Sequence, residues 1–557
     1  MLGHLKTGRE PVAEIGTDNA GSAGGGTFAP LRTPLFRNIW LASLLSNLGF
    51  MFLSVGAAWQ MTLLTPRPEI IALVQSALML PMMLLAIPAG AMADMYDRRK
   101  VALAALCVAL VAAFSLTVLV ALHLLTPSLL LAFCFFVGIG VALYAPSWQA
   151  SVGEQVPRET LPAAVSLASM SFNIGRSVGP ALGGALVAAA GPVAAFAGTA
   201  FGYVPLFTMF ALWKREATPS RLPPERIDRA VGAGVRYVLH SPPIRTVVVR
   251  AFFTTLTGCS ISALMPLVVR DQLHSTAGVF GLLLGCFGVG AVIGGLILPA
   301  VRRRASEQLS VTVASVLLAS GIAIVALSPW YPLSAVALIL CGMSWTISIT
   351  LYNVVIQTSA PRWVSGRLVA SFQTATAAGT ACGSWLWGHV AAGAEVQTAM
   401  LVSAAAAAST TLLGLVLRMP SASDSEHEEV RMSDPEVALD LTGRSGPIVT
   451  EVEYSIAHED AREFYRRMMA VRLLRMRNGA FEWSIARHIA DPQIWVERFT
   501  CPTWHDYLRL RDRNTAEEMA VMQNAQDMIR PGTQLVVRRM LERPFGSVRW
   551  FENTPEM

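Results

Sequence analysis

One arginine of this chain lies inside an apolar segment, where a permanent charge is costly. Arg176 stands near the middle of residues 161–190, which are mostly apolar or small. A charged residue at the centre of a membrane-spanning helix costs at least about 2.5–3.5 kcal/mol on insertion scales unless it faces protein or water. A guanidinium there can contact an anionic or phenolic substrate group. It can also donate structural hydrogen bonds to helix-end carbonyls, and the sequence allows both interpretations.

The residues around Arg176 shape the helix that carries it. We refer to the following residues as the fifth-helix motif: Gly175, Gly179, Pro180, Gly183 and Gly184. Small residues spaced by four allow two helix backbones to approach closely, and a proline removes a backbone donor. We therefore expect this helix to pack against its neighbours while Arg176 faces a polar interior.

A second group of residues follows the second predicted span. This gate motif consists of Gly90, Asp94, Arg98 and Arg99. Gly90 permits close helix contact, and the Asp94 carboxylate can pair with Arg98 or Arg99 or accept from a neighbouring helix N-terminus. Such a pair can break when two halves of a protein rock against each other. A solvated turn that only fixes the topology explains the same residues equally well.

The elements that must position these residues are membrane-spanning helices. The 557 residues are 53% hydrophobic and only 14% charged, whereas soluble proteins typically have about 25% charged residues. About 20 apolar residues span a bilayer. Twelve such runs occur, at 37–64, 70–92, 101–123, 127–147, 161–190, 194–213, 247–269, 277–300, 310–328, 332–356, 367–391 and 396–417. The break at Gly191-Pro192 predicts a tight hairpin. The predicted fold class is an all-α polytopic membrane protein with two six-helix halves, 36–213 and 247–418, joined by a polar central loop, 214–246.

Basic residues predict the orientation of these spans. Loops on the side of the N-terminus carry most of the arginines and lysines, among them 98–100, the central loop and 302–304. The opposite loops carry only Arg67 and Arg270. The positive-inside rule then places both termini in the cytoplasm. We expect a multi-pass protein of the cell (inner) membrane, embedded in the lipid bilayer, with a disordered cytoplasmic tail at 1–35.

The two predicted halves are similar to each other. Tyr144 and residues 149–151 are echoed by Tyr352 and residues 357–359. The glycines at 175, 179 and 184 are echoed by those at 379, 383 and 388. Such a repeat typically produces a parallel pair of six-helix bundles. Chance similarity between helices rich in Gly and Ala is the alternative.

The gate motif and the fifth-helix motif, in this order, resemble the major facilitator superfamily over about residues 36–418. The gate motif matches the superfamily's signature between helices two and three, although the family usually has Gly where this chain has Asp97 and often a basic residue where it has Met95. The fifth-helix motif matches that of the superfamily's antiporters. Asn173 and Arg176 beside it are similar to the enterobactin-exporter-like, or transmembrane secretion effector, branch.

This resemblance implies a secondary transporter that alternates between inward- and outward-open states. Asp94 and Arg98 would belong to a cytoplasmic gate network, and Gly179-Pro180 would bend or pack helix five so that the closed cavity does not leak. The counterpart in the second half is degraded, since Arg302–Arg304 keep the basic residues but no Asp accompanies them.

Polar and aromatic residues inside the spans are the candidates for a substrate cavity. They are Asn47, Gln60, Tyr144, Trp148, Asn173, Arg176, Trp345, Tyr352, Asn353 and Gln373. No Asp or Glu lies deep inside any span. This absence argues against cationic drugs and leads us to expect a substrate with acidic or phenolic groups. Proton coupling has no assigned residue, although Asp94 and Glu154 could titrate at the cytoplasmic face.

A different composition begins after the last span. Residues 419–446 are polar and acidic and read as a linker. Residues 447–557 show the order βαββαβ, which predicts a cytoplasmic α+β ferredoxin-like domain. This domain resembles the dimeric α+β barrel group that includes antibiotic-biosynthesis monooxygenase-like proteins. No Cys/His cluster or phosphate loop occurs, so we assign no metal, cofactor or catalytic residue, and no nucleic-acid-binding motif is present.

The leading hypothesis is an exporter of a small organic molecule, such as a siderophore, a secondary metabolite or a drug. It would be a proton-coupled transporter and not an enzyme, with a small-molecule substrate and a C-terminal domain that regulates or dimerises it. The first alternative is a transporter-like sensor that signals through this domain. The second is a transporter fused to a small monooxygenase-like enzyme.

Overall fold

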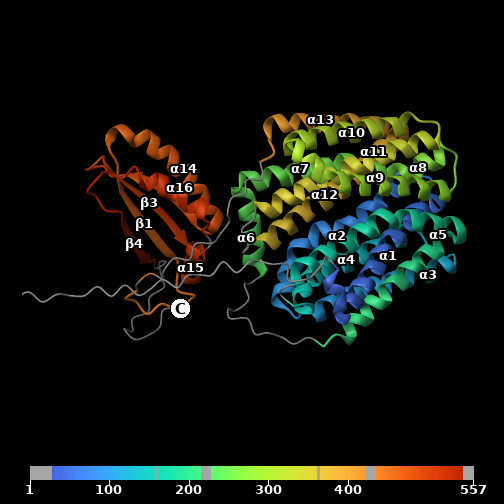
Figure 1. Ribbon diagram of the computed structural model, residues 1–557, viewed down its shortest axis with the longest axis horizontal. Coiled ribbons are helices and arrows are strands. Elements are labelled where there is room, and N and C mark those ends of the chain that lie inside the picture. The colour runs from blue at the N-terminus through green and yellow to red at the C-terminus, as the bar shows by residue number, and fades with distance from the viewer. Residues whose placement is uncertain are drawn as a thin grey trace, which may run out of the picture.

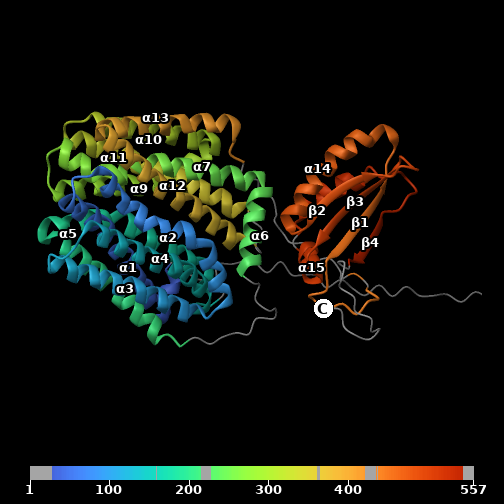
Figure 2. The same ribbon diagram turned by 180° about the vertical axis from the view of Figure 1, so that it is seen from behind.

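The computed structural model describes residues 28–157, 160–214, 227–359, 364–420, 435, 437–512 and 514–542. A large helical bundle and a smaller α/β domain lie side by side (Figure 1). The same division is visible from behind (Figure 2).

The first half of the bundle contains five helical elements. They are α1 (Pro34–Leu64), α2 (Pro68–Met95), α3 (Arg98–Ala121), α4 (Pro127–Gln155) and α5 (Leu161–Leu212). Proline occupies an opening position of α1, α2 and α4, where no backbone donor is needed. Helix α5 contains two predicted spans and turns at Gly191, whose φ is +74°. Because this conformation suits glycine, the predicted hairpin at Gly191-Pro192 is confirmed.

The second half begins with an interrupted helix. Its elements are α7 (Pro242–Gly258), α8 (Ser260–Leu267), a π-helical turn (Val268–Gln272), α9 (Ala277–Arg304), α10 (Glu307–Leu327), α11 (Tyr331–Thr358), α12 (Ser365–Gly393) and α13 (Val396–Val416). Ten helical stretches among the described residues are long and apolar enough to cross a membrane, and the stretch within α5 holds two predicted spans. The less apolar α12 coincides with the predicted span 367–391, so each of the twelve predicted spans lies on a helix.

The predicted central loop differs from the structure in one respect. It contains the strongly amphipathic helix α6 (Ile227–His240), and α7 already begins at Pro242. The sequence analysis did not separate this helix from the polar loop because its apolar residues are too few to form a span. Helix α6 packs against α2, α7 and α12 of the bundle.

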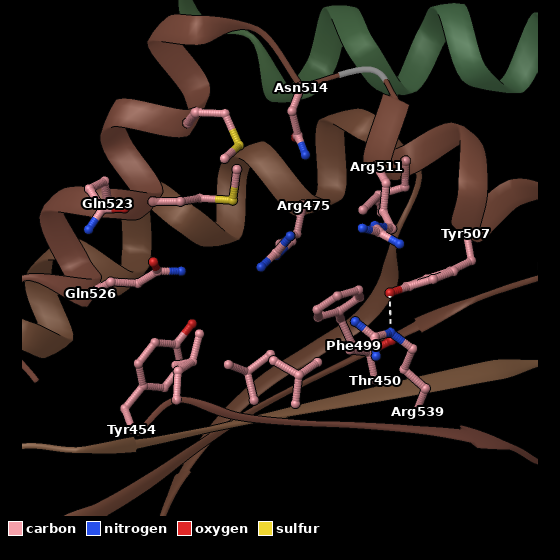
Figure 3. A pocket seen from close by; sticks show the side chains of 16 residues that line it. Thr450, Tyr454, Arg475, Phe499, Tyr507, Arg511, Asn514, Gln523, Gln526 and Arg539 are labelled. Carbon is pink, nitrogen blue, oxygen red and sulfur yellow. Dashed lines mark hydrogen bonds between the residues drawn. The ribbon is translucent and has the colours of Figure 1, made fainter. Parts of the chain in front are cut away.

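The C-terminal domain has the predicted order of elements. They are β1 (Ile448–Ser455), α14 (Ala461–Asn478), β2 (Phe481–Arg487), β3 (Ile494–Cys501), α15 (Trp504–Asp512), α16 (Ala516–Gln526) and β4 (Val536–Leu541). The strands form one antiparallel sheet in the order β2-β3-β1-β4. In its register, Thr450 of β1 lies opposite Phe499 of β3 and Arg539 of β4. A pocket remains between the sheet and the three helices (Figure 3).

Helix α6 lies between the bundle and the C-terminal domain in both views (Figures 1 and 2). It contacts α14 of the domain. The guanidinium of Arg477 lies over the ring of Tyr237, 5.2 Å from its centroid. The domain therefore docks on the helix of the central loop.

Candidate functional site

The glycines of the fifth-helix motif allow α5 to pack closely against α1. A methyl group added at Gly175 would lie 2.7 Å from Cβ of Asn47, and one at Gly179 would lie 2.6 Å from Cβ of Met51. Because real Cβ atoms do not approach within 3.0 Å, only glycine allows these two contacts. Gly183 faces Phe52 less tightly, and an added methyl group would lie 3.2 Å from the Phe52 ring. The expected close packing of the motif is observed.

The neighbouring face of α5 meets the second half of the bundle. A methyl group at Gly184 would overlap the backbone of Gly281 on α9. About two turns away, a methyl group at Gly288 of α9 would overlap the carbonyl of Ser177. Helix α5 is thus held on two sides, by α1 of its own half and by α9 of the other.

The same arrangement recurs in the second half of the bundle. Gly379 and Gly383 of α12 press against α7, at Phe252, Thr255 and Leu256, as Gly175 and Gly179 press against α1. Gly388 presses against Ala72 of α2, as Gly184 presses against α9. The glycine repeat read from the sequence therefore corresponds to equivalent contacts in the two halves.

Arg176 meets a second predicted cavity residue across the two halves. Its guanidinium carbon lies 6.0 Å from the ring centroid of Trp345 on α11. The Trp345 ring packs closely against Gly258 of α7, where an added methyl group would come within 2.6 Å of the ring. Within the described part of the chain, Arg176 has no hydrogen bond or ion pair, and its nitrogens are not among the buried atoms that lack a partner. The charged group therefore faces accessible space.

Four further candidates are half-buried or exposed. Asn47 donates from Nδ2 to Ser171 Oγ at 3.3 Å and so links α1 to α5. Asn173 donates to a carbonyl of its own helix and remains exposed. Gln60 on α1 and Gln373 on α12 are half-buried. These side chains stay candidates for the cavity around Arg176.

The remaining candidates pack inside their own halves. Tyr144 and Trp148 are buried against Phe210 of α5, with ring centroids 5.9 and 6.3 Å away. Tyr352 is buried against Thr254, with their hydroxyls 3.1 Å apart. We leave these three out of the proposed cavity, since aromatic size explains their burial in a helix core. The fourth, Asn353, accepts a hydrogen bond from Gln357 on the same helix.

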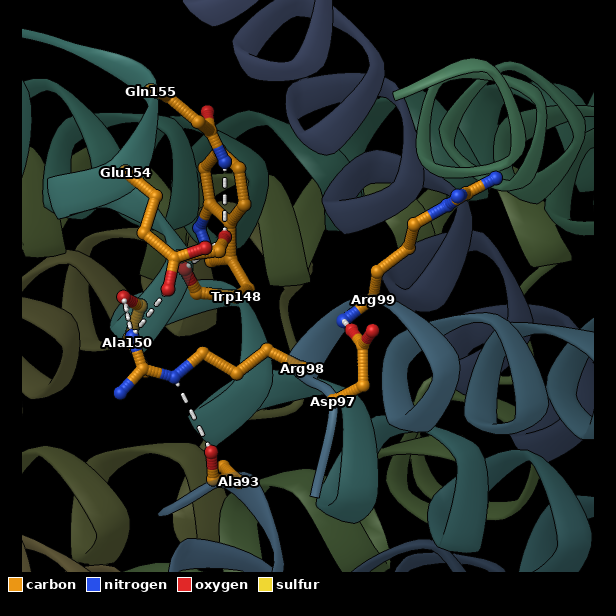
Figure 4. Close-up of polar contacts among 9 residues, drawn as sticks. Ala93, Asp97, Arg98, Arg99, Trp148, Ala150, Glu154 and Gln155 are labelled. Atoms are coloured by element: carbon orange, nitrogen blue, oxygen red, sulfur yellow. Dashed lines mark hydrogen bonds and ion pairs between the residues drawn. The ribbon is translucent and has the colours of Figure 1, made fainter. Parts of the chain in front are cut away.

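The gate motif joins helices of the first half (Figure 4). Arg98 forms an ion pair with Glu154 of α4, with Nη1 and Oε1 2.9 Å apart, and donates to the carbonyls of Ala93 and Ala150. Arg99 donates to the last carbonyls of α5, at Phe210 and Ala211. These donors match the unpaired carbonyls at a helix C-terminus.

Asp94 and Gly90 are the other two residues of the gate motif. The side chain of Asp94 lies outside the described residues, so its pairing with Arg98 or Arg99 stays a prediction. A methyl group at Gly90 would meet nothing within 4 Å, so this structure shows no close helix contact at Gly90, and the role of Gly90 in the gate motif stays a prediction. The sequence analysis named Glu154 as titratable but did not find its pairing with Arg98, since the two are 56 residues apart.

A buried arginine was also missed. Arg250 falls inside the predicted span 247–269 but was not named as a candidate, and it is 3% exposed inside the second half. It donates to Gln308 Oε1 at 2.7 Å and to the carbonyl of Leu417 at 3.1 Å. Its position near the predicted start of a span gave no sign of burial. It ties α7 to α10 and to the end of α13.

Several contacts join the halves at the end of the bundle opposite the gate motif. Arg270 donates to the carbonyl of Thr62 at 3.3 Å. The rings of Trp59 on α1 and Phe280 on α9 stack 5.7 Å apart. Nearer the middle, Ser76 of α2 donates to a carbonyl of α12 at 2.7 Å. These contacts close the bundle at this end.

Comparisons with known proteins agree with this architecture. A family model described as transmembrane secretion effector matches residues 25–545. The enterobactin exporter EntS of Citrobacter koseri is 27% identical over 398 residues, which cover 69% of this chain and 90% of that protein. EntS of Shigella boydii is 26% identical over 394 residues, with coverage of 69% and 91%.

Solved structures show the same fold at low identity. The nucleoside transporter NupG superposes with a TM-score of 0.53 at 12% identity, covering 69% of this chain and 98% of that chain. A bacterial homologue of the human lysosomal transporter Spinster, inward-facing and unoccupied, has a TM-score of 0.52 at 13% identity. It covers 69% of this chain and 95% of its own.

Proposed function

The chain belongs to the transmembrane secretion effector family of the major facilitator superfamily, and from this premise we propose that it exports a small organic molecule with acidic or phenolic groups. Membership of this family makes it a transporter and not an enzyme. Siderophores and other secondary metabolites of this chemistry are the proposed substrates, since its relatives include enterobactin exporters.

The observation that carries this proposal is the position of Arg176. The guanidinium faces accessible space between α5 and α11, beside the ring of Trp345. A cation in a membrane interior is a functional residue by default, and an aromatic ring next to it suits an aromatic substrate group. An anionic or phenolate oxygen would supply the counter-charge that the described residues do not.

We propose that transport proceeds by alternating access of the two halves. The structure would represent the state closed at the end where Arg270 meets Thr62. The positive-inside pattern would place this end outside the cell and the gate motif in the cytoplasm. The opposite state would require the contacts around Arg270 to break while the gate motif closes.

We also propose that the proton gradient drives export. Glu154, which pairs with Arg98 beside the predicted cytoplasmic face, is the described carboxylate that we connect with this coupling. Everted membrane vesicles test this proposal, because export then appears as uptake. An uncoupler should abolish that uptake, and unchanged uptake would contradict the coupling.

Three probes in the same vesicles test the substrate class. We expect uptake of enterobactin or of salicylate, and none of the cation ethidium. Uptake of ethidium together with failure of both anionic probes would overturn the proposed substrate class. The natural substrate is then sought by an untargeted comparison of metabolites in the medium and in the cells of a deletion strain.

We propose that the C-terminal domain regulates the transporter rather than working independently of it. Its docking on α6 through Tyr237 and Arg477 connects it to α2 and α12 of the two halves. We propose that it adopts the ferredoxin-like arrangement of the dimeric α+β barrel group and senses conditions in the cytoplasm. This second function, a sensor joined to a transporter, rests on that contact.

A further inference from the structure

The pocket of the C-terminal domain lies between its sheet and its helices and has a volume of about 160 Å³ (Figure 3). Alternate residues of β1 and β4 form its floor, because side chains alternate between the two faces of a strand. Helices α14, α15 and α16 form its roof. Strand β4 lies at the edge of the sheet, and Val537 and Arg539 on it are exposed. The pocket is therefore reachable from this edge.

The size and the apolar lining of the pocket fit one ring. A cavity of about 150 Å³ lined by apolar side chains can hold benzene. The apolar part of the lining consists of Val452, Phe499, Leu510, Met519, Met522, Leu535 and Val537. Methionine side chains adapt to irregular ligands and contact aromatic rings favourably. The lining thus suits a single aromatic or cyclic aliphatic body.

The charged part of the lining is entirely basic. Arg475, Arg511 and Arg539 line the pocket, and no Asp or Glu does. Arg475 is anchored by the buried Glu497, with Nε and Oε1 3.2 Å apart. Burial works most strongly against its charged form, but Glu497, Tyr454 and Tyr507 together outweigh burial and raise the pKa of Arg475. This ion pair is a fixed part of the wall, so Arg475 is not free to bind a ligand.

Arg539 is the arginine best placed to bind a ligand. Its Nε donates to the hydroxyl of Tyr507 at 2.6 Å, which orients the guanidinium over the pocket. No carboxylate pairs with it among residues 437–512 and 514–542. Thr450 of β1 lies opposite Arg539 of β4 in the sheet register. The buried hydroxyl of Thr450 also has no hydrogen-bond partner among residues 437–512 and 514–542. A buried hydroxyl without a partner is costly, and a polar ligand group would satisfy it.

We propose that this pocket binds a small organic anion, with its carboxylate or phenolate at Arg539 and a body of one ring against the sheet. Charge-assisted bonds from a guanidinium to a carboxylate are the strong ones in proteins. A series of contacts also connects the pocket wall to helix α6. Asn514 accepts a bond from Asn478, which also donates to Glu518, and Glu518 pairs with Arg477, whose guanidinium lies over Tyr237 of α6.

Binding of benzoate to the purified full-length protein tests this proposal by titration calorimetry. Benzamide, which has the same shape without the charge, serves as the matched probe. We expect benzoate to bind, and benzamide to bind at least about tenfold more weakly. Equal affinities for the two probes, or no binding of benzoate at millimolar concentration, would overturn the proposal.

Variants locate the site. Arg539→Gln should weaken benzoate binding by about tenfold or more. Arg538→Gln is the control, because the neighbouring arginine pairs with Glu453 and does not line the pocket. Met522→Trp should abolish binding by filling the cavity, which keeps the proposal testable if Arg539→Gln fails to fold. Unchanged binding in folded Arg539→Gln and Met522→Trp proteins would refute it.

A further variant separates this site from the transport path. Arg176→Gln should keep the benzoate binding that Arg539→Gln weakens, since that pocket lies in the C-terminal domain, and any binding lost in Arg176→Gln alone belongs to the transport path. Loss of binding in Arg176→Gln with full binding in Arg539→Gln would assign the ligand to the membrane part and overturn the proposal. Because the readout is binding and not transport, failure of the export proposal would leave this result intact.

Discussion

At the scale of one residue, the contacts of Arg176 do not by themselves account for a charge inside the membrane part. A cation–π contact such as the one with Trp345 stabilises by up to about 2 kcal/mol when desolvated. Placing arginine at the middle of a membrane helix costs at least about 2.5–3.5 kcal/mol. The ring therefore does not offset the cost by itself. Water in an open cavity, or an anionic substrate, must supply the rest.

Substitution of Arg176 tests this account. Arg176→Gln should abolish uptake of anionic probes in everted vesicles, while Arg176→Lys should keep part of it, because a lysine retains the charge but not the planar fork. Both proteins should insert and purify normally. Arg302→Gln, at the exposed end of α9, is the control with the same loss of charge. Normal flux in Arg176→Gln would remove the residue from the transport path.

The ion pair of Arg98 and Glu154 gives a second prediction at this scale. The two side chains are 27% and 22% exposed, and such partly exposed pairs contribute only about 0–1 kcal/mol to stability. Glu154→Gln should therefore change the transport rate much more than the thermal unfolding temperature. The exchange Arg98→Glu with Glu154→Arg should restore part of the rate. A large loss of thermal stability with normal transport would show that the pair is structural.

At the scale of helices and strands, the glycine faces of α5 and α12 explain how two similar halves fit together. Helix α5 presents three glycines and α12 two to the first helix of its own half, and each presents one to the other half. Small side chains at these positions let backbones approach, which is the main source of helix association in a membrane. A single added methyl group is therefore expected to disturb the interface.

Gly184→Ala tests the interface between the halves. The new methyl group would overlap the backbone of Gly281, and overpacking of this kind typically costs about 1–3 kcal/mol. We expect a lower thermal unfolding temperature in detergent and reduced transport. Gly295→Ala on α9 is the control, because nothing lies within 4 Å of its added methyl group. Equal stability of the two variants would contradict the close contact.

The elements predicted from the sequence are those with a strong repeating pattern. Apolar runs located the helices, and the spacing of Gly175, Gly179 and Gly184 predicted close packing. Helix α6 was missed because amphipathic segments between arginines read as polar loops. Tyr144 and Tyr352 were predicted to line the cavity, but the direction in which a side chain points from a uniformly apolar helix is not encoded by hydropathy. The pairing of Arg98 with Glu154 depends on tertiary contact and was equally hidden.

At the scale of the whole molecule, the contact of the C-terminal domain with α6 connects the soluble and membrane parts. Tyr237 is 1% exposed. Burial raises its pKa to about 12, although Arg477 beside it acts in the opposite direction. The phenol is therefore neutral at any physiological pH, and Arg477, whose charge is held by Glu518, lies over a neutral ring. Because α6 contacts α14, a movement of α6 against α2 or α12 would directly change the contacts of α14.

Tyr237→Leu tests whether this ring holds the domain in place. The substitution keeps an apolar side chain but removes the surface on which Arg477 lies, while the pair of Arg477 with Glu518 remains. We expect faster hydrogen exchange in α6 and α14 and an altered transport rate, with the difference the same at neutral and mildly alkaline pH because the phenol does not ionise there. Tyr465→Leu, on the exposed face of α14, is the matched control. If both variants exchange like the original protein, the domain is held by other contacts. If exchange rises while transport is unchanged, docking does not regulate the transporter.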